Sequence, residues 1–139
     1  MAQQIQDIMT KQLHTVRVDT TMLDVARLMR DRQIGDVLVL QRDGTLHGIV
    51  TDRDIVVRAV AAGLPDRTPV SEVCTSNIVG LDPTASIDEA VTMMREHAIR
   101  RVPVVRDGKP IGIVSIGDLA RLKDPSSALA EISAAAPNN

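Results

Sequence analysis

The sequence predicts an α/β (α+β) protein built from two successive β-α-β-β-α repeats. Two observations carry this prediction: the halves of the chain match each other in order, and each half contains the same strand-to-helix corner. The first corner is Gly48–Asp54 (GIVTDRD) and the second is Gly112–Asp118 (GIVSIGD). In each corner an apolar run passes through Thr or Ser directly into a helical pattern. We expect the halves to pack on each other about a pseudo-twofold axis, because one repeat of roughly 60 residues buries little core alone.

The two halves of the chain align along most of their length. A shift of 65 residues pairs residues of the same type, among them Thr10 with Thr75, Met29 with Met94 and Val39 with Val104. After one residue is dropped, a shift of 64 pairs the two corners, so that Asp54 falls on Asp118. So many matches in order, with one gap, indicate a tandem repeat. We place the first repeat at residues 1–64, a linker at 65–69, the second repeat at 70–123 and a flexible tail at 124–139.

Each repeat is predicted to open with a short apolar helix, then a brief extended piece at 15–18 or 78–81, then an amphipathic helix. The amphipathic helix is indicated by apolar residues spaced i, i+3, i+4 and i+7, which are Met22, Val25, Ala26 and Met29 in the first repeat and Ile87, Ala90, Val91 and Met94 in the second. Thr21 before Asp24, and Ser86 before Glu89, have the spacing of a capping box, which marks the start of such a helix.

A β-hairpin and a last helix complete each repeat. Strands are expected at 36–41 and 46–50 in the first repeat and at 101–106 and 111–114 in the second, around turns that contain Asp-Gly. The last helix is expected over 52–62, ended by Gly63, and over 116–123, ended by Asp124 and Pro125.

Composition excludes several classes of function. The 139-residue chain is 44% apolar and 24% charged, as globular domains are, and its net charge of −2 argues against a general nucleic-acid or membrane-surface binder. It has no Phe, Tyr or Trp, so no nucleobase can stack on an aromatic ring.

No secretory signal or membrane-spanning run is recognisable, so we expect a cytoplasmic protein. The single cysteine, Cys74, is expected to be buried and inert, and the spacing of His14, His47 and His97 predicts no metal site.

Each corner places a hydroxyl, a carboxylate and unpaired backbone N–H groups where a strand turns into a helix. Thr51 with Asp54, and Ser115 with Asp118, have the spacing at which the hydroxyl caps the helix while the acid accepts a backbone N–H. The same groups can hold a small polar molecule. Taken alone, the spacing fits a purely structural cap. Because the chain has no recognisable Ser–His–Asp arrangement, P-loop or zinc motif, we expect it not to be an enzyme.

Paired β-α-β-β-α repeats that each contain Gly–aliphatic–x–Thr/Ser–x–x–Asp before a helix resemble a cystathionine-β-synthase (CBS) domain pair, or Bateman module. The resemblance covers about Ile5 to Lys123 and rests on the segments VARLMRDRQIGDVLVL, LHGIVTDRDIV, AVTMMREHAIRRVPVV and PIGIVSIGDLA. Because this span leaves no room for an attached enzyme or transporter, the chain looks like a stand-alone bacterial CBS-pair protein. Within that group it is similar to the hypoxic response protein family.

The resemblance implies a site for adenine nucleotides in the cleft between the repeats. In that family the Thr/Ser–x–x–Asp corner binds ribose and phosphate, which carries this role to the two corner pairs, Thr51 with Asp54 and Ser115 with Asp118. A carboxylate can accept both hydroxyls of a ribose, and the phosphate then needs N–H groups and a cation. Arg100 and Arg101 are the nearest cations in the pattern, although they fit the solvated start of a strand equally well. The family places the adenine near the start of the hairpin, at Thr15, Val37, Leu38, Val102 and Pro103.

The resemblance therefore implies a regulatory module that requires no cofactor and senses AMP, ADP, ATP or a related adenosyl ligand such as S-adenosylmethionine. The two clefts are expected to differ in affinity, because Ile116 and Gly117 stand where the first repeat has Asp52 and Arg53. The alternative is a ligand-independent scaffold that acts through an unidentified protein partner in a stress or dormancy response. In either case we expect a homodimer, since the helices carry more aliphatic side chains than one small domain can cover, among them Val56, Val57 and Val60.

Overall fold

The computed structural model describes residues 3–123 of the chain, and the predicted tail at 124–139 lies outside the described residues. The chain forms two compact units. Among the described residues, the first-repeat unit comprises 14–78, and the second-repeat unit comprises 3–13 together with 79–123. The mixture of helices and strands confirms the predicted α/β (α+β) class. The expected packing about a pseudo-twofold axis stays a prediction.

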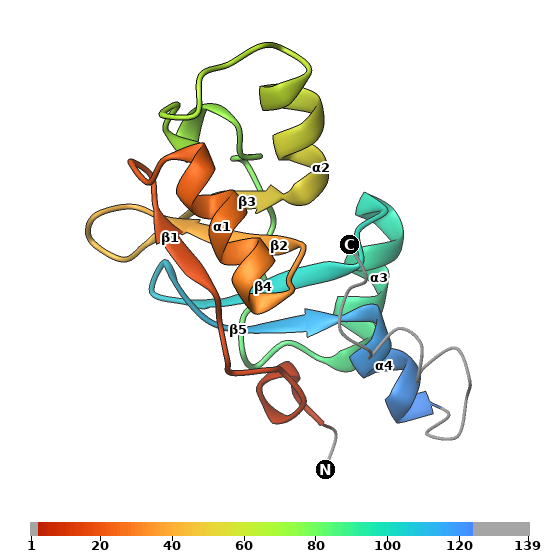
Figure 1. The fold of residues 1–139 in the computed structure, drawn as a ribbon. Coiled ribbons are helices and arrows are strands. Elements are labelled where there is room, and N and C mark those ends of the chain that lie inside the picture. Colours follow the sequence, from red (N-terminus) through yellow and green to blue (C-terminus); the bar gives the residue numbers. More distant parts are fainter. Residues whose placement is uncertain (1–2, 124–139) are drawn as a thin grey trace. The chain divides into compact units, whose positions relative to one another are not determined.

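A three-stranded sheet, ordered β1-β2-β3, forms the centre of the first-repeat unit (Figure 1). Strands β1 (Thr15–Arg17) and β2 (Asp36–Leu40) run parallel, and β2 forms an antiparallel hairpin with β3 (Leu46–Thr51). Parallel neighbours need a crossover connection, and helix α1 (Met22–Arg32) supplies it. The helix buries one apolar face, including Val25, against the strands.

The last helix of the first repeat has two geometries. Strand β3 passes directly into α2 (Asp52–Asp54), which continues as the π-helix η2 (Ile55–Val60). The predicted helix over 52–62 is therefore present, but most of it has wider turns than an α-helix. In the wide turns the N–H of Ala61 donates to the carbonyl of Val56 at 2.9 Å, five residues back. A short 3-10 helix, η3 (Val70–Glu72), follows the linker.

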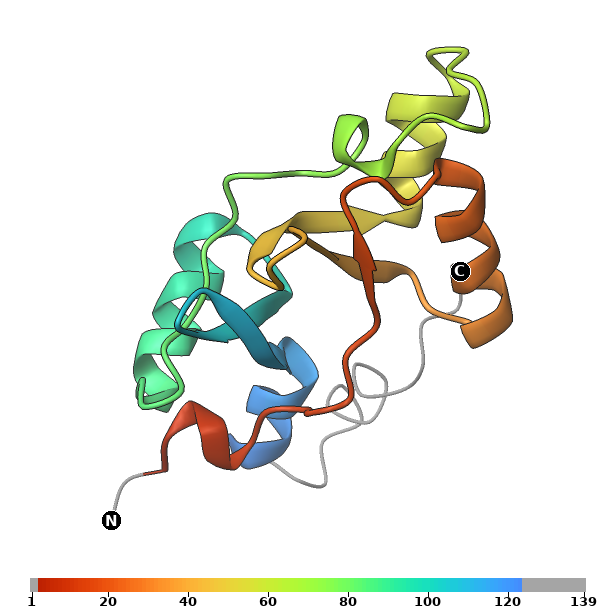
Figure 2. The ribbon, with the colours of Figure 1, turned by 90° about the vertical axis from the view of Figure 1, so that its left-hand side faces the viewer.

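The second-repeat unit repeats the hairpin and the helices (Figure 2). Strands β4 (Arg101–Arg106) and β5 (Lys109–Ser115) form a two-stranded antiparallel sheet, preceded by α3 (Ile87–His97) and followed by α4 (Ile116–Lys123). A 3-10 helix, η1 (Ile5–Asp7), comes from the start of the chain.

The extended piece predicted at 78–81 is shorter than expected. Only Leu81 pairs, in a single parallel bridge to Val104, where it donates to the Pro103 carbonyl and accepts from the Val105 N–H. The next residues, Asp82 to Ala85, turn at once, with the N–H and hydroxyl of Thr84 donating to the Asp82 carboxylate. The next residue that would face β4 is Pro83, which has no backbone N–H to donate, so the strand does not continue.

The opening helix of each repeat belongs to the unit that contains the other repeat's corner. Thr10, at the start of the chain, exchanges two backbone hydrogen bonds with Ile113 of β5 (2.8 and 2.9 Å). In the equivalent place, Thr75 exchanges two with Ile49 of β3 (2.9 and 2.9 Å). Each unit therefore contains sequence from both repeats, and its boundaries near 13 and 78 differ from those of the repeats themselves.

Each unit has its own aliphatic core. In the first-repeat unit, α1 and the strands bury side chains with the opening segment of the second repeat, including Val25, Val39, Val50, Val70 and Val73. In the second-repeat unit the core includes Ile5, Ala90, Met94, Val104 and Val114. Ile5 and Val70, which the 65-residue shift pairs, are both buried, so the short apolar helices are structural parts of these cores.

The first glycine of each corner lies where the opening segment crosses the strand. A side chain at Gly48 would collide with the backbone carbonyl of Thr75, and one at Gly112 would collide with the side chain of Met9. The two sites differ in what would have to move, because a backbone segment held by two hydrogen bonds yields less than a flexible Met side chain.

We predict that Gly48→Ala lowers the free energy of unfolding more than Gly112→Ala does. Overpacking against backbone should cost about 2 to 3 kcal/mol at Gly48, and about 1 kcal/mol at Gly112, where Met9 can change rotamer. Urea unfolding of both variants measures the difference. Equal losses at the two positions would contradict the crossing seen here.

Candidate functional site

The two corners have the same hydrogen-bonded geometry. The hydroxyl of Thr51 accepts the N–H of Asp54 at 3.1 Å, and the Asp54 carboxylate returns the bond by accepting the N–H of Thr51 through Oδ2 at 3.0 Å. In the second corner the hydroxyl of Ser115 accepts the N–H of Asp118 at 3.2 Å, and Asp118 Oδ2 accepts the N–H of Ser115 at 2.8 Å. Both are reciprocal capping boxes, as predicted from the spacing.

These caps engage one carboxylate oxygen of each aspartate. Asp54 and Asp118 both lie in partly buried positions, with Oδ2 bonded to the backbone. A carboxylate has two oxygens and about four lone-pair sites, so Oδ1 keeps accepting capacity while the cap stays intact. The structural role and a ligand role are therefore compatible at these positions.

Strand register brings the other predicted site residues of the first repeat to the same end of the sheet as the corner. Asp36 pairs with Thr51, and Thr15 at the start of β1 pairs with Leu38. Thr15 is exposed, whereas Val37 and Leu38 are each 1% exposed. The Val37 side chain belongs to the core of the unit. Because the Val37 side chain packs in the core, only the backbone of Val37 is suited to bind a ligand.

The second repeat has the same arrangement with different chemistry. Arg101 pairs with Ser115, Val102 with Val114 and Pro103 with Ile113. The carbonyl of Arg100 accepts the N–H of Ile116 at 2.8 Å, which ties the start of β4 directly to the start of α4. Val102 lies in the core and Pro103 is buried. The structure thus brings the backbone of Arg100 and Arg101 beside the Ser115 corner, and a phosphate role for their side chains stays a prediction.

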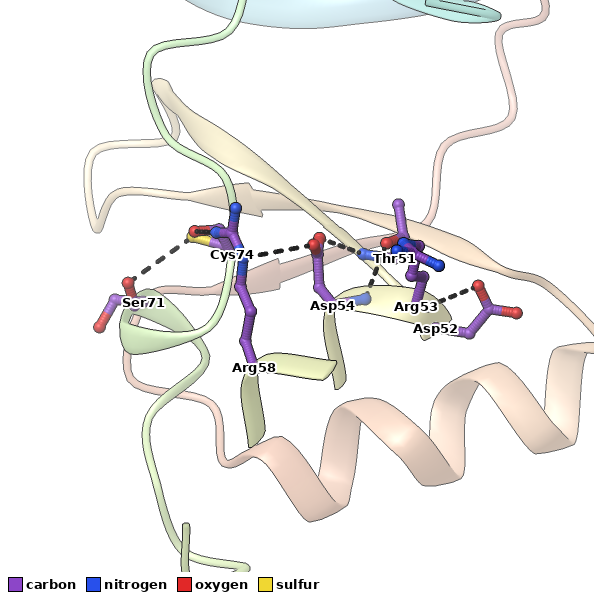
Figure 3. Close-up of polar contacts among 7 residues, drawn as sticks. All are labelled: Thr51, Asp52, Arg53, Asp54, Arg58, Ser71 and Cys74. Atoms are coloured by element: carbon purple, nitrogen blue, oxygen red, sulfur yellow. Dashed lines mark hydrogen bonds and ion pairs between the residues drawn. The ribbon is translucent and has the colours of Figure 1, made fainter. Parts of the chain in front are cut away.

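Sequence reasoning missed one residue at the first corner. Arg58 Nε lies 3.8 Å from Asp54 Oδ1, and Arg58 Nη1 donates to the carbonyl of Cys74 at 3.4 Å (Figure 3). The Asp54 side chain is 15% exposed and that of Arg58 is 53% exposed. The signal was an acid followed four residues later by Arg on one helix, a favourable pairing. Leu122 occupies the equivalent position after Asp118.

Cys74 is buried, as predicted, at 7% exposure. Burial is the main cause that raises the pKa of the Cys74 thiol above its ordinary value, and the negative charge of Asp54 acts in the same direction. The thiol lies near the Ser71 carbonyl, at 3.8 Å (Figure 3). Because the thiolate is the reactive form, this environment keeps Cys74 unreactive at neutral pH.

Residues 3–123 offer neither a metal cluster nor a membrane span. No group of three or more His, Cys, Asp or Glu side chains in that range could hold a metal ion. None of the helices found there has the length and apolar character needed to cross a membrane.

The comparison with protein families agrees with this architecture. The family model of the CBS domain matches twice, over residues 5–60 and again over residues 70–124. The chain belongs to the CBS domain family. One match falls in each half of the chain, which confirms the tandem CBS organisation.

CBS proteins of similar length resemble this chain closely. The CBS domain-containing protein YhcV of Bacillus subtilis is 40% identical over 116 residues, which are 84% of this chain and 82% of YhcV. Hypoxic response protein 1 of Mycobacterium tuberculosis is 40% identical over 116 residues, or 83% of this chain and 81% of that protein. The predicted similarity to the hypoxic response protein family is confirmed.

Solved structures show the same fold. A crystal structure of Hypoxic Response Protein I with two coordinated zinc ions has a TM-score of 0.78 and 38% identity, and covers 86% of this chain and 98% of that one. The CBS domain pair of protein MJ0100, in complex with 5′-methylthioadenosine and S-adenosyl-L-methionine, has a TM-score of 0.77 and 25% identity, and covers 91% and 100%. A CBS pair of this fold therefore holds adenosyl ligands.

We predict that Thr51→Ala and Ser115→Ala each lower the free energy of unfolding by about 1 kcal/mol, because each removes the acceptor of a helix-capping bond. Thermal or urea unfolding measures the loss. Thr92→Ala, at an exposed position inside α3, is the control and should cost nothing. A neutral effect at both corners would mean that the hydroxyls do not cap in solution.

Proposed function

We propose that this CBS pair is a regulatory module that binds an adenosyl ligand, either an adenine nucleotide (AMP, ADP or ATP) or a relative such as S-adenosylmethionine. The observation that carries the proposal is the corner geometry. In each repeat a partly buried carboxylate is held rigidly by a capping box through one oxygen and retains the other for a sugar diol. The adenosyl ligands bound by the MJ0100 pair support the assignment.

In this function the ligand acts by binding one arrangement of the protein more tightly than another. It can shift that equilibrium only by its difference in affinity for the two states. We propose that the shift is read as an energy or stress signal. CBS pairs are generally regulatory, and we propose no catalytic role and no required cofactor for this one.

The alternative is a scaffold that needs no ligand and works through a protein partner. One observation favours it: Asp54 and Asp118 already have a structural task in the capping boxes, so their presence alone does not require a ligand. A ligand that binds only the native state must raise the melting temperature, whereas a scaffold would not respond to nucleotides. A thermal-shift panel of AMP, ADP, ATP and S-adenosylmethionine therefore separates the two functions.

We predict that Asp54→Asn and Asp118→Asn each weaken adenosyl-ligand binding about tenfold or more at their own corner. The amide keeps the size of the side chain but replaces a charged acceptor of two hydroxyl donors. Calorimetric titration with AMP measures the affinity. Asp31→Asn, the same loss of charge at an exposed position near the end of α1, is the control and should bind like the unchanged protein. If both variants bind like the unchanged protein, the corners are not the ligand site.

We also propose a homodimer, formed through exposed apolar helix faces. Val56, Val57 and Val60 of η2 are 59%, 49% and 63% exposed, which is unusual for three neighbouring valines. On α4, Ile116 is 47% exposed and lines an apolar hollow of ≈ 380 Å³ with Met94 and Leu119. A second copy of the chain could cover such surfaces.

We predict that the double variant Val56→Glu/Val60→Glu is monomeric while the unchanged chain sediments as a dimer at micromolar concentration. Burying a carboxylate without a partner costs several kcal/mol, enough to dissociate a small interface. Analytical ultracentrifugation gives the masses. Gln41→Glu, an exposed position in the hairpin turn, is the control and should leave the dimer intact. A monomeric unchanged chain would refute this proposal.

A further inference from the structure

We propose that Arg58 makes the first corner select phosphorylated adenosyl ligands over unphosphorylated ones. This inference rests on the proposed function and assigns a specificity-determining role to a residue outside the Thr/Ser–x–x–Asp pattern. Its starting point is a difference between the repeats: Arg58 follows Asp54 by four residues, whereas Leu122 follows Asp118 by four.

Two contacts orient the guanidinium of Arg58, and they leave some of its N–H donors available to a ligand. Its Nε lies 3.8 Å from Asp54 Oδ1, and its Nη1 donates to the Cys74 carbonyl at 3.4 Å (Figure 3). Arginine has five N–H donors in a planar fork. The contacts with Asp54 and Cys74 use Nε and Nη1, and the side chain is 53% exposed, so donors remain on the solvent side.

The Cys74 carbonyl that fixes Arg58 is itself fixed. Thr75, the next residue, exchanges two hydrogen bonds with Ile49 of β3, and its backbone lies against Gly48. Cys74 also donates its N–H to the Val70 carbonyl at 2.9 Å. The backbone of the opening segment of the second repeat therefore helps to orient Arg58, which lowers the entropy lost when the guanidinium binds an anion.

Electrostatics then determine which ligand the corner prefers. A ribose whose diol meets Asp54 brings its phosphate within one Debye length of that carboxylate, and the two negative charges repel. Arg58 offsets this repulsion and can donate to the phosphate oxygens through its remaining N–H groups. A ligand without a phosphate gains neither effect. The selectivity therefore depends on the arginine side chain, while the sugar contact depends on Asp54.

The second repeat lacks a cation on its helix side. Leu122 stands in place of Arg58, and Ile116 and Gly117 replace Asp52 and Arg53. Its arginines, Arg100 and Arg101, come instead from the start of β4. The contribution of Arg58 must therefore be measured at the first corner alone, in a protein whose second corner carries Asp118→Asn.

The test compares AMP with adenosine, which differ only by the phosphate, in calorimetric titrations of the Asp118→Asn protein with and without Arg58→Gln. We expect Arg58→Gln to weaken AMP binding about tenfold and to change adenosine binding less than twofold. Arg58→Lys should recover part of the AMP affinity, because it restores charge without the fork. Arg42→Gln, which removes an exposed arginine in the hairpin turn at the opposite end of β2 and β3, should leave the AMP-to-adenosine ratio unchanged.

Each other outcome overturns the proposal. Equal loss of AMP and adenosine binding would show that Arg58 only supports the shape of the corner, and an equal effect of Arg42→Gln would show that general charge is responsible. If the Asp118→Asn protein binds neither ligand while Asp54→Asn still binds AMP, the ligand sits at the second corner and this inference alone fails. If the unchanged protein binds no adenosyl ligand, the proposed function fails with it.

Discussion

The structure depends on one constraint, the crossing of an opening segment over the glycine of a corner. Thr10 bonds to Ile113 beside Gly112, and Thr75 bonds to Ile49 beside Gly48. A repeat of roughly 60 residues has too little apolar surface to fold alone, and the crossing supplies the missing part. Ile5 enters the core of the second-repeat unit, and Val70 and Val73 enter the core of the first-repeat unit. Sharing segments in this way makes each unit depend on both halves of the chain.

The same crossings place the candidate ligand groups. Thr51 and Ser115 follow the glycine at each crossing by three residues, so the strand is already held in place where the helix begins. The capping boxes then fix Asp54 and Asp118 through one oxygen each. A carboxylate held this way loses little entropy on meeting a ligand, which is the benefit of using a structural cap as a binding group. The corners differ mainly in their cations, with Arg58 on the helix side of one and Arg100 and Arg101 on the strand side of the other.

Much of the architecture could be predicted because local patterns encode it. The i, i+3, i+4, i+7 pattern located α1 and α3, and Asp-Gly turns located both hairpins, with bounds within one or two residues of those observed. The departures have local geometric causes. The extended segment predicted at 78–81 forms only a single bridge at Leu81, because the chain turns at Asp82. The helix after Asp54 has the wider turns of a π-helix. Which segments share a core could not be read, because hydrophobic periodicity shows that a face is buried and not what buries it.

The sequence by itself determined that the chain is a tandem CBS pair, where its helices and hairpins lie, and that Thr51 with Asp54 and Ser115 with Asp118 form caps. The helices, hairpins and caps rest on spacings of a few residues, and the tandem arrangement rests on repetition, which are properties of the chain order. The assignment to the CBS family rests on the resemblance of these segments to known CBS pairs. Tertiary structure alone decided that the opening segments join the other repeat's corner. It also decided that the side chains of Val37 and Val102 pack in the cores, and that Arg58 contacts the Cys74 carbonyl. These contacts join residues 16 to more than 100 positions apart, from Arg58 with Cys74 to Thr10 with Ile113. No local pattern reports them, because they form only when distant segments pack together.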